Sequence, residues 1–130
     1  MTTPYFLVIP IAPRTKKNSQ QIVKIKGRLM VIPSKAYKQF EKDCGAFIPQ
    51  IPFSALEQPV NVKCVYYMPT HRRVDLVNLQ EATLDILVKY GVLADDNSNI
   101  VVSMDGSRVL YDKNNPRTEI EITVLQDVNE

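Results

Sequence analysis

The stretch MPTHRRVDLVNLQEATLDILVKYGVLADD, residues 68–96, decides the fold because it contains the clearest helix pattern in the chain. Between Leu76 and Tyr90 there is neither Gly nor Pro, either of which would weaken a helix. Asp75 precedes this run as a favourable N-cap residue, and Gly91 follows it as a favourable residue for ending a helix. We therefore predict a helix over Leu76–Tyr90.

The apolar side chains of this helix cover a wide part of its surface. At about 100° per residue they fill an arc of roughly 200°, which is wider than packing on one sheet face requires. The surplus lies around Val77, Leu84 and Val88, and it predicts a contact with a second subunit in a homodimer. Polar residues share the opposite side, with Asp75 at its edge: Asn78, Glu81, Asp85 and Lys89.

Strand patterns and a second helix pattern flank this helix. Branched or alternating apolar residues predict strands, and Ser34 is a favourable N-cap residue for another amphipathic helix. Together they predict an α+β fold in a single domain over residues 1–130, with a mixed β-sheet and two main helices packed on it. The predicted elements are a strand Tyr5–Ile11, a two-stranded ribbon Gln21–Ile32 turning near Gly27, a helix Lys35–Phe47, a strand Val60–Met68, a long strand Ile100–Tyr111 with a bulge or turn at Asp105–Gly106, and a strand Arg117–Leu125.

Length and composition fit one globular domain. A chain of 130 residues can bury a core, and 45% hydrophobic with 23% charged residues is ordinary for a globular protein. Cys44 and Cys64 have no partner pattern for zinc, so we expect buried free thiols. Neither a secretory leader nor a run long enough to span a membrane is recognisable, and we expect a cytoplasmic protein with no membrane partner.

Charge is distributed unevenly along the chain. The net charge of +2 excludes a strong global field. The first third nevertheless has only Glu41 and Asp43 as acids, so a polyanion would meet this end first. Its basic residues are Arg14, Lys16, Lys17, Lys24, Lys26, Arg28, Lys35, Lys38 and Lys42.

Carboxylates stand at both ends of the central helix. Mg²⁺ and Mn²⁺ prefer oxygen ligands, so Asp75 and the Asp95–Asp96 pair could hold such an ion if the chain folds back after Gly91. Alternatively, Asp75 merely caps the helix and Asp95-Asp96-Asn97 merely makes a polar turn. Spacing alone favours this second use.

The central motif also carries a family resemblance. Residues 68–79, followed by Asp85, Gly91, Val92 and Asp95–Asp96, resemble the RusA family of Holliday junction resolvases. Weaker similarity extends to the loop Pro-Arg-Thr-Lys-Lys-Asn at 13–18 and to Pro-Arg-Thr-Glu-Ile-Glu-Ile at 116–122. The resemblance implies a small dimeric α+β, RusA-like endonuclease that uses Mg²⁺ or Mn²⁺ to nick two opposed strands of a four-way DNA junction.

The family motif is matched at some positions and changed at others. Asp75 and Asn78 match the Asp-x-Asp-Asn start of the family helix, and Asp96 aligns with the later catalytic acid. Val77 replaces the second motif Asp, and Glu81 stands where the family has a helical lysine. Because residues four apart share a helix face, we hypothesise that Glu81 supplies the missing carboxylate.

These matches lead to a set of expected site residues. Asp75, Glu81 and Asp96 are the expected catalytic residues and, with Asp95, the expected metal ligands, while Asn78 and Asp85 are expected to orient them. A solvated helix face is the competing interpretation for Glu81 and Asp85. We expect phosphate contacts from Lys16, Lys17, Asn18, Arg72 and Arg73, although surface solubility would also account for them.

Other interpretations of the sequence remain open. His71 could act as a general base, but a lone histidine in a basic loop is more often a bystander. The protein could bind branched DNA without cleaving it, because Val77 replaces a ligand. A third possibility is an interaction protein with no role on nucleic acids, which the near-neutral net charge favours.

Overall fold

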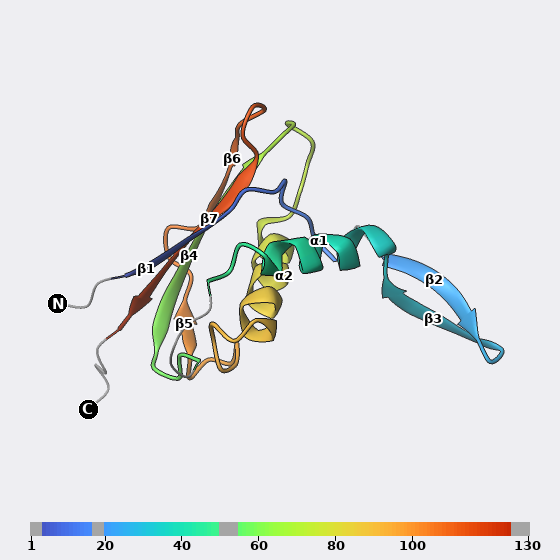
Figure 1. Cartoon of the computed structure of the whole chain (residues 1–130), viewed down its shortest axis with the longest axis horizontal. Coiled ribbons are helices and arrows are strands. Elements are labelled where there is room, and N and C mark those ends of the chain that lie inside the picture. Colours follow the sequence, from blue (N-terminus) through green and yellow to red (C-terminus); the bar gives the residue numbers. More distant parts are fainter. Residues whose placement is uncertain (1–3, 17–19, 50–54, 126–130) are drawn as a thin grey trace.

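In the computed structural model, which describes residues 4–16, 20–49 and 55–125, two helices pack on one mixed sheet (Figure 1). The sheet consists of β1 (Tyr5–Ile9), β4 (Val60–Met68), β5 (Val101–Ser103), β6 (Arg108–Tyr111) and β7 (Arg117–Val124). The remaining elements are the helices α1 (Lys35–Gly45) and α2 (Leu76–Lys89) and the ribbon strands β2 (Gln20–Ile25) and β3 (Arg28–Pro33). The predicted α+β class with two helices on a mixed sheet is confirmed.

β4 is the central strand of the sheet. It pairs antiparallel with β7 along one side, and parallel with β5 and then β6 along the other. β1 completes the opposite edge by pairing antiparallel with β7. The sheet residues of β4 that face the helices are fully covered, as the alternating pattern predicts: Val60, Val62, Cys64 and Tyr66.

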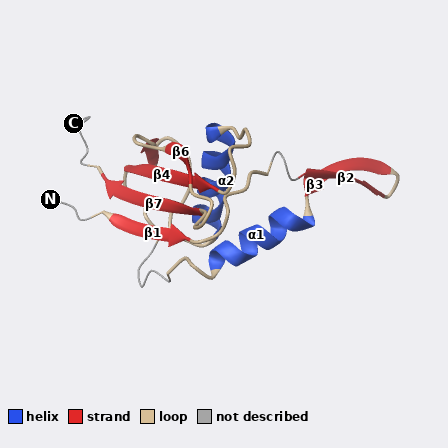
Figure 2. Ribbon diagram, turned by 90° about the horizontal axis from the view of Figure 1, so that it is seen from above, coloured by secondary structure: helices blue, strands red, loops and turns tan. Residues whose placement is uncertain are grey.

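Both helices cover the same face of the sheet (Figure 2). α1 begins as predicted, because the Ser34 hydroxyl accepts a hydrogen bond from the Tyr37 amide at 3.1 Å. The two helices meet where the Tyr90 ring lies against Gly45, and the Tyr90 hydroxyl donates to the Glu41 carbonyl at 3.0 Å. α2 buries a stripe of its surface against the sheet: Leu79, Ala82, Thr83, Ile86 and Leu87.

Several element boundaries differ from those expected. Residues 100–111 form β5 and β6, not one long strand, and they are separated by the turn at Asp105–Gly106. The Asn61 side chain of β4 stabilises this break, because its Oδ1 accepts from the Ser103 hydroxyl at 2.6 Å and the Asp105 amide at 2.8 Å. β1 was expected to be buried to Ile11, but it ends at Ile9 and is exposed on one face. α1 ends at Gly45, before the expected Phe47.

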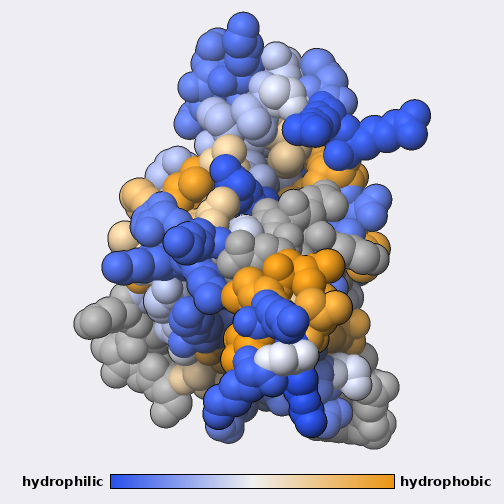
Figure 3. Space-filling model, turned by 90° about the vertical axis from the view of Figure 1, so that its right-hand side faces the viewer, coloured by the Kyte–Doolittle hydropathy of each residue, from blue (hydrophilic) through white to orange (hydrophobic). Residues whose placement is uncertain are grey.

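The ribbon β2–β3 projects from the body beyond the start of α1 (Figure 1). Its strands pair with each other in a separate two-stranded sheet, turning through Lys26 and Gly27 at positive φ, as predicted. Seen from its end, the ribbon side of the molecule shows an apolar patch bordered by hydrophilic side chains (Figure 3). The exposed apolar residues of the ribbon are Ile22, Ile25, Leu29, Met30 and Val31.

The remaining expectations concern cysteines and membranes. Cys44 and Cys64 are both free and buried, as predicted. Burial raises the pKa of each thiol to about 12, so neither is a reactive thiolate at neutral pH. Among the helices of the described residues, none combines the length and apolar character needed to cross a bilayer.

Candidate functional site

Asp75 is the N-cap residue of α2, but its side chain makes no capping hydrogen bond. Its backbone carbonyl accepts the Leu79 amide at 3.1 Å, whereas its carboxylate accepts the Asn78 side-chain amide, also at 3.1 Å. Asp75 is exposed, and the Asn78 amide holds one oxygen of its carboxylate. This geometry leaves Asp75 free to bind a ligand.

Asp95 and Asp96 have different roles in the turn after α2. The Asp95 carboxylate accepts from the Asp96 amide at 2.7 Å and from the Asn97 side chain at 3.1 Å. These hydrogen bonds lower the pKa of Asp95 and give it the local turn role that the sequence allowed. Asp96, by contrast, is not used to build the turn through its carboxylate. Asp96 is exposed, and slight desolvation raises its pKa first, followed by the side-chain interaction with Asp95 and the negative charges of Asp95 and Asp85.

The chain does fold back after Gly91, whose φ of 76° allows the reversal. Leu93 then bridges to Leu56, and the Val60 amide donates to the Ile100 carbonyl at 2.7 Å, so the Asp95–Asp96 turn lies near the beginning of β4. Asp75 instead follows the loop that leaves the far end of β4 at Met68. The two acidic ends are separated by α2, whose 14 residues extend about 21 Å.

Within one chain, therefore, the expected carboxylates do not converge. Across the described parts of the chain, no cluster of three or more His, Cys, Asp or Glu side chains is close enough to hold a metal ion. Two acidic groups exist instead: Asp75 with Asn78 at one end of α2, and Asp96 with Asp95 and Asp85 toward the other.

Asp85 connects the second acidic group to Lys16, in the segment that follows β1. The Lys16 ammonium contacts the Asp85 carboxylate at 2.6 Å, although the two residues are far apart in sequence. Lys16, expected at DNA phosphate, thus pairs with an acid, while Lys17 and Asn18 lie outside the described residues. Asp85 lies close enough to Asp96 for its charge to raise the Asp96 pKa.

Tyr37 of α1 is a further neighbour of this region. Its hydroxyl is buried and has no hydrogen-bond partner in the described part of the protein. Burial raises its pKa most, and the charges of Glu41, Asp85 and Glu81 raise it further. No sequence signal links Tyr37 to these acids, because α1 and α2 are joined only by their packing. Glu81 itself is exposed.

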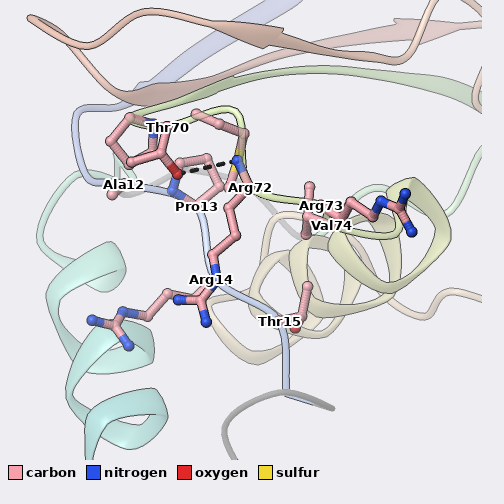
Figure 4. Close-up of a pocket in the computed structure, with 10 residues that line it drawn as sticks. Ala12, Pro13, Arg14, Thr15, Thr70, Arg72, Arg73 and Val74 are labelled. Carbon is pink, nitrogen blue, oxygen red and sulfur yellow. Dashed lines mark hydrogen bonds between the residues drawn. The ribbon is translucent and has the colours of Figure 1, made fainter.

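A basic cavity of about 610 Å³ is lined in part by the residues that come directly before Asp75 (Figure 4). It lies between the segment after β1 and the loop that links β4 to α2, and it is lined by Arg14, Arg72 and Arg73. Arg72 extends in the direction of Arg14, whereas Arg73 points away over the start of α2. None of the ion pairs found among residues 4–16, 20–49 and 55–125 involves these three arginines, so their charges are available to an anion.

A second cavity, of about 330 Å³, shares Met68, Thr70 and Arg72 with the first. His71 lies in this cavity with its ring stacked on Tyr111, the centroids 3.9 Å apart and the planes 25° apart. The structure thus gives His71 an aromatic partner, which its position in a basic loop did not predict.

The donor atoms of both acidic groups suit a hard cation. Each offers carboxylate or amide oxygens, while the two cysteines are buried in the core and His71 is stacked on Tyr111. An oxygen-only donor set fits Mg²⁺ or Mn²⁺ and disfavours zinc.

A comparison with models of protein families identifies the family of this chain. The family model described as Endodeoxyribonuclease RusA matches residues 10–123. This span includes both acidic groups, both cavities and the ribbon. No protein with a curated description matches the chain.

Proposed function

The chain belongs to the RusA family of endodeoxyribonucleases, and from this premise we propose that it resolves four-way DNA junctions by metal-dependent, paired nicking of opposed strands. The observation that carries the proposal is the basic cavity beside Asp75. Arginines that are free of ion pairs can hold phosphate there, next to a carboxylate that its own helix does not use. The proposal therefore takes these arginines as the phosphate site and Asp75, the residue that follows the cavity-lining Val74, as a metal ligand.

A homodimer would complete the site. We propose that two copies pack their α2 helices antiparallel about a twofold axis, so that the Asp75 end of one copy meets the Asp96 end of the other. The apolar surface for this contact is the stripe expected from the sequence: Val77 is 70% exposed, and Leu84 and Val88 are half-buried. A twofold dimer has two such sites, which accounts for paired cuts.

The chain's own residues then have separate tasks. Arg14 and Arg72 hold the phosphate by charge-assisted hydrogen bonds, and Asn78 keeps the Asp75 carboxylate oriented. Lys16 holds Asp85 in place through their ion pair. A bound Mg²⁺ or Mn²⁺ would polarise the phosphate and activate the attacking water. Asp75, Asp85 and Asp96 would hold it, with Glu81 as the further ligand proposed from the sequence.

Mixing two inactive variants tests both the chemistry and the shared site. Asp75→Asn and Asp96→Asn should each abolish nicking of a mobile four-way junction in Mg²⁺ or Mn²⁺. If each site takes Asp75 and Asp96 from different copies, a mixed dimer contains one intact site and regains single-strand nicking. If both acids act from the same copy, no mixed dimer is active. Nicking that survives Asp75→Asn would remove Asp75 from the site.

A second function is favoured by one observation. Val77 presents an apolar, 70% exposed side chain where the family carries a ligand, and no three-acid cluster forms within the described residues. A protein that binds branched DNA without cutting it would fit these facts. Tight junction binding with no nicking in either metal, by the unmodified protein, would establish this alternative.

A further inference from the structure

The stacked pair His71–Tyr111 is the feature of this surface that phosphate binding and metal binding do not use. Both side chains are exposed, and Tyr111 retains 43% of its surface in contact with solvent. Their rings stack with centroids 3.9 Å apart, and neither residue belongs to the hydrophobic core. They line the 330 Å³ cavity together with apolar side chains of β6, Val109 and Leu110.

The framework under these rings is fixed. Tyr111 pairs with Met68 in the β4–β6 register, and the Asp112 amide donates to the Met68 carbonyl at 2.9 Å. His71 follows Met68 by three residues, and the Thr70 hydroxyl accepts the Arg72 amide at 3.3 Å. The rings are therefore held at the edge of the sheet in a defined position, which lowers the entropy cost of binding a flat ligand.

The two cavities together have the layout of one nucleotide. The arginine-lined cavity suits a phosphate, the aromatic cavity suits a planar ring, and Arg72 lines both. Nucleobases stack on aromatic side chains whatever their sequence, and arginine contributes further contacts to phosphate or base. A base stacked in duplex DNA cannot enter, whereas a base at a branch point is unstacked at lower cost.

Resting on the proposed junction function, we propose that His71 and Tyr111 form a subsite for an unstacked nucleobase at the branch point, next to the phosphate held by Arg14 and Arg72. The subsite makes the protein prefer branched over linear DNA, because only branched DNA supplies the base. It reads the presence of an unstacked base and is tolerant of its identity.

The test uses the full-length protein and a four-way junction carrying 5-iodouracil at the branch point, with a linear duplex carrying the same base in the same sequence. Without divalent metal, irradiation should crosslink the junction base to Tyr111 or His71, and the duplex base to neither. Tyr111→Ala and His71→Ala should each lower junction affinity roughly tenfold or more, with little change in duplex affinity. Tyr111→Phe, which keeps the ring, should bind like the unmodified protein.

Phe6→Ala is the matched control, because Phe6 is an exposed aromatic residue on β1 at the opposite edge of the sheet. His71 lies in a loop, so its variant keeps the test valid even if Tyr111→Ala does not fold. Unchanged junction affinity in His71→Ala, with no crosslink at either ring, would overturn the subsite while leaving the resolvase proposal intact. Failure of the unmodified protein to bind the junction would overturn both.

Discussion

At the scale of single residues, the acids around α2 differ in what the fold already requires of them. The Asp95 carboxylate stabilises its own turn, because it accepts hydrogen bonds from two local donors. Among the described residues, Asn78 is the side chain that contacts the Asp75 carboxylate, and Lys16 is the one that pairs with Asp85. Acids whose carboxylates are oriented but not needed for folding are the better candidates for chemistry, and this distinction favours Asp75, Asp85 and Asp96 over Asp95.

Glu81→Gln tests the carboxylate that the sequence offers in place of Val77. The change keeps the shape and removes the charge, so it should abolish metal-dependent junction nicking and leave folding unaltered on an exposed helix face. Nicking rates with Mg²⁺ and Mn²⁺ measure the effect. Glu57→Gln, an exposed acid outside α2, is the control. Activity close to that of the unmodified protein would remove Glu81 from the ligand set.

Asp112→Asn tests the ion pairs at the β6–β7 connection. Arg117 donates to Asp112 at 2.9 Å and to Glu119 at 2.8 Å, and its guanidinium covers the Tyr67 ring at 3.7 Å. The Arg117 hydrogen bond lowers the pKa of Asp112, so the folded state favours the charged carboxylate. Its stabilising effect is present above the ordinary Asp pKa and is lost as the pH falls through the lowered value.

Thermal unfolding as a function of pH measures this effect. Asp112→Asn should be less stable than the unmodified protein at neutral pH, and the difference should shrink under acidic conditions. Asp105→Asn, in the exposed turn before β6, is the comparison. A stability difference that stays constant from neutral to strongly acidic pH would rule out the ion pair as its cause.

At the scale of elements, α2 and the ribbon were predictable because their signals are local. Helical spacing with Asp75 and Gly91 at the ends defined α2, and paired strands about Gly27 defined the ribbon. The break between β5 and β6 depends on Asn61 of a distant strand, so only the possibility of a turn was visible in the sequence. The Lys16–Asp85 pair and the His71–Tyr111 stack likewise join residues that only the fold brings together.

Gly45→Ala tests the contact between α1 and α2. A Cβ at this position would overlap the Tyr90 ring, whose hydroxyl is held by the Glu41 carbonyl. The helix-propensity gain of alanine, about 1 kcal/mol, should be outweighed by the strain, giving a net loss of roughly 1–2 kcal/mol in the free energy of unfolding.

Denaturant unfolding measures the loss, and a second substitution checks its cause. In a Tyr90→Leu background the ring is gone, so Gly45→Ala should cost little or even stabilise α1. An equal loss in both backgrounds would show that the ring is not responsible.

At the scale of the whole molecule, one helix separates the two acidic groups that the proposed metal site would need together. The sequence showed the acids and the helix, but the direction of the return after Gly91 was set by Leu56 and Val60, residues of another segment. In the proposed dimer, the length of α2 makes activity depend on association, so dilution below the dimer dissociation constant should lower nicking per subunit. The mixed-dimer experiment and this concentration dependence are independent tests of a site that takes Asp75 from one copy and Asp96 from the other.

The projecting ribbon also has a consequence for motion. A two-stranded hairpin standing alone is only marginally stable in water, and β2 and β3 hydrogen-bond only with each other, whereas β4 is paired on both sides. Backbone amides in the ribbon should therefore exchange their hydrogens for deuterium through local opening. The amides of β4 and β7 should exchange only when the whole protein unfolds. Mass spectrometry would resolve the two timescales. Slowing of ribbon exchange when branched DNA is added would identify the ribbon as an arm that becomes ordered on its substrate.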